Sequence, residues 1–172
     1  MNTVEHLAKV IAQDMHLEEK TINELHHLFT ISDNDTKAIE KLQEIIKLSP
    51  DFWKNFYTRC LRNTALQKII SDSQFFKKHK RAIVDYFLKL LTNKIDYDYI
   101  LNRFAIGIQL EKATVEPILF ANILSNFYLQ LIRYCEDIIH DTSLLAEIIQ
   151  SYLKIVFLDL TLILHAYFFM KE

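Results

Sequence analysis

The sequence predicts an all-α protein, and three observations support this prediction. The chain of 172 residues contains one glycine and two prolines, which leaves little turn chemistry for β-hairpins. Apolar residues make up 51% of the chain and recur at helical spacing in most segments. The stretch from Ile155 to Met170 is apolar almost all the way round, as expected for a helix buried on more than one side.

The composition limits the classes of function. The length fits one domain over residues 1–172. The net charge of -2 gives no electrostatic basis for binding nucleic acid. Cys60 and Cys135 lie in helical apolar patterns, which indicates buried thiols in a reducing cytosol rather than a disulfide. The N-terminal segment is amphipathic and interrupted by charges, so we expect no signal peptide and a cytoplasmic location.

The first elements follow from local signals. Val4, Leu7 and Ile11 keep helical spacing, so residues 3–15 predict a helix, followed by a short helix and a connection up to residue 31. Ser32 with Asp35 three residues later resembles a capping box, which predicts a helix start there. Next, Ser49-Pro50-Asp51 combines a cap, a proline and an acid, and predicts a further helix.

Three later helices are predicted by their starts and stripes. Ser73 caps a helix whose face includes His79, Ile83 and Tyr86, and a helix beginning near Asp96 follows it. Thr114 is expected to cap a long helix with Pro117 in its first turn. The buried stripe of this long helix is expected to be Phe120, Leu124, Phe127, Leu131, Cys135 and Ile138.

Asp141 is expected to begin the final helix. Its apolar run is shorter than the ~20 residues of a membrane span and carries Asp159 and His165, so we expect no span. Its all-round apolar surface has two explanations. Either a second subunit covers one side, or the helix runs through the middle of a monomer.

The helix after Asp96 contains an unusual stripe. Ile100, Arg103, Gly107 and Leu110 share one face. A glycine on an inward face allows another backbone or a ligand to come close. An arginine there is costly unless an anion meets it.

The same segment carries a family resemblance. The pattern D-x-x-Y-hydrophobic-x-x-R-x-x-I-G-hydrophobic resembles the F helix of the globin sensor domain of bacteria, found in globin-coupled sensors and protoglobins. Segments 50–61, 77–91 and 157–168 resemble that family's B, E and last helices. The family's haem-binding histidine falls on Leu110, which has no lone pair for iron. The residues that match the pattern are Asp96, Tyr99, Ile100, Arg103, Ile106, Gly107 and Ile108.

The resemblance is strongest to the non-haem branch, which includes the stand-alone sporulation-inhibitory sensor proteins of bacilli. It implies a globin-like fold with an N-terminal extension over residues 1–31 and a globin core over 32–172. It also implies a homodimer through the last two helices, and a fatty acid in place of haem, with no cofactor. The chain ends with its final helix, so we expect no output module. The implied action is to inhibit sporulation by competing for the signal of, or pairing with, a homologous sensor histidine kinase.

Arg103 is the main candidate site residue. Its guanidinium group fits a carboxylate bidentately, and the resemblance implies that it binds the fatty acid and a small anion such as chloride. The structural alternative is that Arg103 pairs with Asp96, Asp98 or another acid of the chain. Arg133 is the second candidate for the carboxylate. We expect Arg103→Ala to abolish carboxylate binding while leaving the fold intact. The residues expected to line the ligand are Tyr57, His79, Ile83, Ile106, Leu110, Phe127 and Leu131.

Two of these residues also have a purely structural explanation. His79 lies where globins place a distal histidine and would give sensitivity to pH near neutrality, or it is a hydrogen-bonded core or rim residue. Tyr57 matches a family position whose hydroxyl group faces the pocket, or it is a core tyrosine with a satisfied hydroxyl group.

Other classes have less support. The histidines show no zinc-ligand spacing, and there is no phosphate-binding glycine loop or nucleophile elbow. We therefore expect no metal site and no enzyme. Two alternatives remain open, a haem-based gas sensor with an unexpected ligand and a ligand-free interaction module with a filled core.

Overall fold

The computed structural model describes residues 3–48, 51, 54–55, 58, 62, 86 and 94–171. This part of the chain is helical and contains no strand, which confirms the all-α prediction. The helices predicted between residues 50 and 91 lie outside the continuous described segments. The helices are α1 (Thr3–Asp14), α2 (Glu19–Leu28), α3 (Asp33–Leu48), α7 (Tyr97–Lys112), α8 (Pro117–Ile138) and α9 (Thr142–Phe169).

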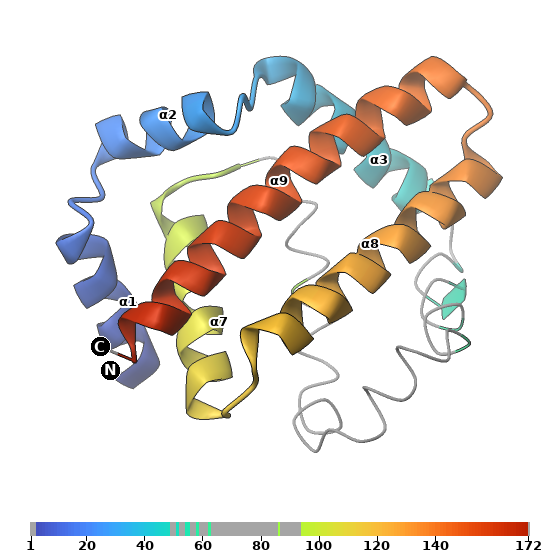
Figure 1. Cartoon of the computed structure of the whole chain (residues 1–172). Coiled ribbons are helices and arrows are strands. Elements are labelled where there is room, and N and C mark those ends of the chain that lie inside the picture. The colour runs from blue at the N-terminus through green and yellow to red at the C-terminus, as the bar shows by residue number, and fades with distance from the viewer. Residues whose placement is uncertain are drawn as a thin grey trace.

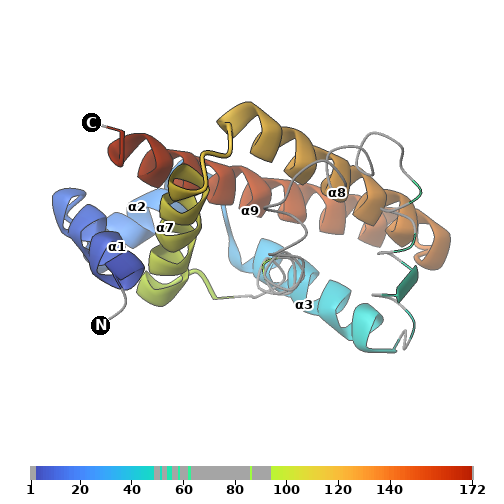
Figure 2. The same cartoon turned by 90° about the horizontal axis from the view of Figure 1, so that it is seen from below.

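Helix α9 is the element around which the others pack. It contacts α1, α3, α7 and α8. Figure 1 shows α8 antiparallel to α9, and Figure 2 shows α7 crossing α9 from below. The prediction of a final helix buried on more than one side is confirmed, with Leu158, Ile163 and Ala166 fully buried. Neighbouring helices of the same chain therefore cover much of its surface.

Helix α9 is long and apolar enough to cross a membrane, judged by length and composition alone. Half of its most apolar stretch is buried inside the fold. The core helix of a folded domain passes the same test, and α9 carries Asp159 at a buried position.

Local capping sets the start of three helices. The Asp96 carboxylate accepts a hydrogen bond from Tyr99 N (3.0 Å) and begins α7. The Asp141 carboxylate accepts from Ser143 N (3.0 Å) and begins α9, as predicted. At the start of α3, the Asp35 carboxylate accepts from Ser32 N (2.8 Å), which is one half of the predicted capping box.

The predicted cap at Thr114 is wrong. Helix α8 begins at Pro117, with Glu116 in the capping position and extended at ψ 138°. Proline favours the first helical position and forces the residue before it into an extended conformation, so the start is fixed by Pro117. Thr114 lies in the preceding turn at φ 54°, and its hydroxyl group donates to Ala113 O (2.7 Å).

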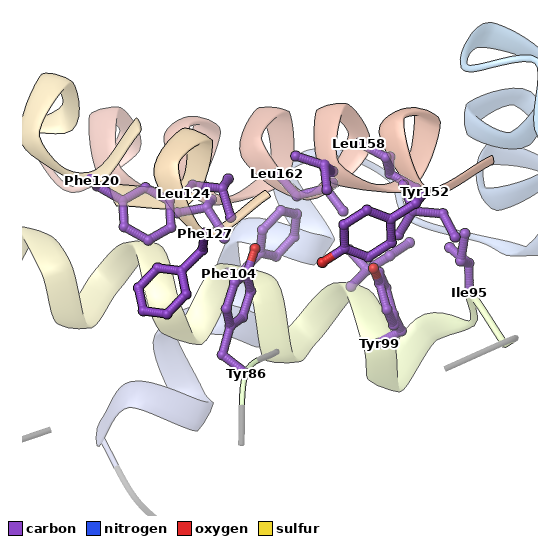
Figure 3. Close-up of a cluster of buried hydrophobic side chains, with 14 of the residues drawn as sticks. Tyr86, Ile95, Tyr99, Phe104, Phe120, Leu124, Phe127, Tyr152, Leu158 and Leu162 are labelled. Atoms are coloured by element: carbon purple, nitrogen blue, oxygen red, sulfur yellow. The ribbon is translucent and has the colours of Figure 1, made fainter. Parts of the chain in front are cut away.

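The core contains side chains from α1, α3, α7, α8 and α9. Figure 3 shows Phe104 of α7 facing Phe127 of α8 and Leu162 of α9. The stripe predicted for α8 is buried from Phe120 to Cys135, and Ile138 is half-buried. Cys135 is a buried free thiol whose pKa is raised to about 12, chiefly by burial. Cys60 lies outside the described residues.

Candidate functional site

Arg103 lies in the core and forms an ion pair with a carboxylate from another helix. Both Arg103 of α7 and Asp159 of α9 are 0% exposed. Arg103 Nε donates to Asp159 Oδ2 at 2.7 Å. Burial lowers the pKa of the guanidinium group, but Asp159 outweighs that effect and holds it above its ordinary value. Arg103 is therefore a permanent buried cation with a built-in counter-ion.

Tyr99 completes this contact. Its hydroxyl group donates to Asp159 Oδ1, so each carboxylate oxygen receives one donor from α7. Tyr99 and Arg103 are four residues apart and share one face of the helix. The guanidinium carbon also lies 4.1 Å from the centre of the Tyr99 ring, a cation–π distance. The carboxyl group of Asp159 has its pKa raised by burial, against the opposing effect of Arg103 and Tyr99.

One donor of Arg103 has no partner among the residues that the structure describes. Nη1 donates to Asn102 Oδ1 at 2.8 Å. Nη2 is buried and makes no hydrogen bond to any described residue. A buried N–H group without an acceptor costs about 1–3 kcal/mol. Within the part of the chain that the structure describes, Nη2 is therefore a buried donor that could bind a ligand oxygen, an ion or a water molecule.

Two further tyrosines surround the ion pair. The Tyr86 ring lies 5.0 Å from the Arg103 guanidinium carbon, and Tyr152 of α9 is 2% exposed. Figure 3 shows the side chains of Tyr86, Tyr99 and Tyr152 in one cluster beside α7 and α9. Burial, with a further contribution from Asp159, raises the pKa of Tyr86, Tyr99 and Tyr152 above the ordinary value. These hydroxyl groups therefore stay protonated, as hydrogen-bond donors.

Gly107 lets α7 and α9 approach closely. A Cβ atom at this position would lie 2.2 Å from Ile163 O and 3.0 Å from Tyr167 N. Both are backbone atoms of α9, so no side-chain movement relieves the clash. Of the two possibilities that the sequence left for this glycine, a neighbouring backbone or a ligand, the structure shows the backbone.

The motif on α7 thus has a physical explanation, because its residues start the helix and form its contact surface with α9. Asp96 caps the helix, and Tyr99 and Arg103 meet Asp159. One turn further on, Gly107 receives the α9 backbone. The structural alternative for Arg103 is therefore realised with Asp159, since Asp96 caps α7 and pairs with Lys94 (3.0 Å).

The other described candidates lie on α7 and α8. Leu110 and Phe127 are buried, and Ile106 is half-buried. Leu131 lines a gap of about 10 Å³ between α3, α8 and α9, too small for a ligand. Arg133 is exposed on α8, so it is not placed to meet a buried carboxylate. The candidates that lie outside the described residues are Tyr57, His79 and Ile83.

Sequence reasoning missed Asp159 as the partner of Arg103. The signal was present, because an acid in the middle of an apolar helix needs a cation as much as an inward arginine needs an anion. No local spacing joins them, since they are 56 residues apart.

A second polar cluster joins α3 to α9 at a distance from this pair. Ser151 Oγ (2.8 Å) and Lys154 Nζ (2.9 Å) donate to the Asp35 carboxylate. Lys154 also donates to Thr30 O (2.9 Å). The cluster borders a polar hollow of about 450 Å³ that does not include Arg103. Because its donors and acceptors are paired with one another, its geometry is that of a structural tie between the two helices.

The helical fold, with α7 and α8 packed on a long final helix, is that of a globin-like domain. The sequence matches the family described as Protoglobin over residues 18–172. The chain therefore belongs to the protoglobin family and is a globin sensor domain. No match was found among curated proteins.

The family implies haem, and α7 does not fit it. The position of the expected axial histidine is Leu110, a buried side chain that cannot bind iron. No histidine lies between Asp96 and Ile139. On α9, which packs against α7, the ring centroid of His165 lies 6.1 Å from that of Phe104.

Proposed function

We propose that this globin sensor domain binds a carboxylic amphiphile, such as a fatty acid, in place of haem, and that it has no catalytic activity of its own. The observation that carries the proposal is the buried Nη2 atom of Arg103, an N–H donor with no acceptor among the described residues. An apolar interior with one fixed donor suits a ligand with an apolar tail and an oxygen head group. A small anion such as chloride would satisfy the same donor.

We further propose that the domain acts in the cytoplasm as a homodimer through α8 and α9. Both helices keep large apolar side chains exposed, among them Leu129 (46%) on α8 and Phe157 (54%) on α9. A dimer of this kind would pair with, or compete for the signal of, a homologous sensor histidine kinase, with inhibition of sporulation as the outcome. This regulatory part of the proposal rests on the sequence resemblance.

The ligand is tested by extraction and by binding. We expect mass spectrometry of a denaturing extract of the purified protein to recover a fatty acid. We also expect decanoic to hexadecanoic acids to raise the melting temperature. Arg103→Met combined with Asp159→Asn keeps the core uncharged and should lose the response. Arg133→Met is the matched control and should keep it. If Arg133→Met alone loses binding, the carboxylate contact passes to Arg133.

The ligand-free interaction module remains the second candidate. It is favoured by the contact between Arg103 and Asp159, which gives the arginine a structural role without any ligand. Recovery of no lipid, together with no thermal response to any added acid, would establish it over the sensor proposal.

Haem binding is tested separately by titration with hemin. Because Leu110 offers no ligand to iron, we expect no sharp Soret band. A stoichiometric Soret band with the spectrum of axial histidine ligation would instead show that the domain is a haem-based sensor.

A further inference from the structure

The net charge around Arg103 limits the charge that a ligand can add to the site. Arg103 and Asp159 are each 0% exposed, and together they are electrically neutral. An ionised carboxylate placed at Nη2 would leave two carboxylates facing one guanidinium group in an apolar interior. A net charge in such a place is costly, and two carboxylates that share a site do not both stay ionised.

The surrounding groups do not supply the missing positive charge. Tyr99 on α7, Tyr152 on α9 and Tyr86 have raised pKa values, so they are uncharged near neutral pH. Lys154 of α9 is engaged by Asp35. His165 lies against Phe104, not against Asp159. In the part of the chain that the structure describes, Arg103 is the one cation in contact with Asp159.

We propose that a carboxylic acid binds at Arg103 together with one proton, which the ligand carboxyl group and Asp159 share. This inference rests on the proposed function and adds a regulation to it. The ionised acid and one proton from solvent enter, and the occupied site is neutral again. The proton belongs to the carboxyl pair rather than to either group. Burial already raises the pKa of Asp159, which favours this uptake.

The consequence is a pH-dependent affinity that needs no histidine. A free carboxylic acid is ionised well above its pKa of about 4, so one proton is taken up for each molecule bound near neutrality. By linkage, the Kd of the acid then rises about tenfold for each unit of pH. A neutral analogue such as the corresponding alcohol needs no proton, and its Kd should not depend on pH.

Isothermal titration calorimetry of the unaltered protein tests the proposal. Decanoic acid and 1-decanol are titrated at about pH 7.5 in phosphate and in Tris, which differ in ionisation enthalpy. The buffer dependence of the heat gives the number of protons taken up. We expect about one proton for the acid and none for the alcohol. Measurable binding of the acid without proton uptake would overturn the inference and leave the proposed function intact.

Asp159→Asn supplies a second test. The amide oxygen can still accept from Arg103 Nε and the amide NH2 group can donate to the Tyr99 hydroxyl oxygen, while the guanidinium charge becomes available to the ligand. We expect decanoic acid to bind this variant without proton uptake and with a Kd that no longer changes with pH. The proton count on the unaltered protein decides the proposal even if this variant does not fold.

Two further outcomes with the unaltered protein are distinguishable. Failure of both the acid and the alcohol to bind would overturn the proposed function. Binding of the alcohol alone at every pH would overturn the inference.

Discussion

At the scale of single residues, the contact between Arg103 and Asp159 governs how α7 sits on α9. Breaking a buried ion pair by removing one partner costs more than the pair contributes, because the other charge is left alone in the core. The sequence-based expectation that Arg103→Ala would leave the fold intact does not allow for this cost, since Asp159 would remain buried without its cation.

We expect Arg103→Met to lower the free energy of unfolding by about 3–5 kcal/mol. Adding Asp159→Asn should recover more than half of the loss, because the core is then uncharged and Tyr99 keeps a hydrogen-bond partner. Urea denaturation followed by circular dichroism measures both values. Arg133→Met, at an exposed position, is the control. Additive effects of the two substitutions would show that the pair is not coupled.

Gly107 sets the distance between the same two helices. We expect Gly107→Ala to destabilise the fold by about 1–3 kcal/mol, despite the higher helix propensity of alanine, because the new methyl group meets backbone atoms. Thermal unfolding measures the effect. Gln109→Ala, at an exposed position of α7, controls for helix propensity. A stabilised Gly107→Ala protein would mean that α7 and α9 pack less closely than described.

At the scale of elements, Asp35 ties α3 to α9. Burial alone raises the pKa of its carboxyl group. Hydrogen bonds from Lys154, Ser32 and Ser151 outweigh that effect and lower the pKa from 3.8 to about 2. A depressed pKa in the folded state adds stability above the unfolded value of 3.8, and this stability is lost as the pH falls toward 2.

We therefore expect Asp35 to contribute about 2 kcal/mol at neutral pH, lost between about pH 5 and pH 2. The measurement is the free energy of unfolding as a function of pH for the unaltered protein and for Asp35→Asn. The difference between the two curves isolates Asp35 from other acids. The two curves should converge at low pH, and a constant gap between them would contradict the assignment.

Element starts were predictable wherever one residue and its own backbone set them. The starts of α7 near Asp96 and of α9 at Asp141 agree with the sequence prediction, because the Asp96 and Asp141 caps reach only two or three residues along the chain. The prediction of a cap at Thr114 was wrong because two local signals competed, a capping threonine and a helix-starting proline, and Pro117 set the start. At Ser32 only half of the capping box forms. The Asp35 carboxylate that forms it also accepts hydrogen bonds from two residues of α9, so this start depends on tertiary contacts as well.

At the scale of the whole molecule, the exposed apolar side chains of α8 and α9 lead to a prediction about assembly. If a second copy covers them, Leu129→Glu with Phe157→Glu should convert a dimer into a folded monomer, because charges in an apolar interface are strongly disfavoured. Light scattering coupled to size exclusion measures the mass. Leu28→Glu, 75% exposed on α2, is the control. A monomeric unaltered protein at high concentration would contradict the dimer.

The helical class, the family motif, the buried stripes and most helix starts could be predicted from the sequence. These properties depend on spacing along one helix or on contacts within a single turn. The contact of Arg103 with Asp159 and the close approach of the Ile163 backbone to Gly107 are seen in the folded molecule alone. The reason is that the two charges lie on different helices, and no local sequence pattern identifies them as partners. They come into contact when α9 packs across α7.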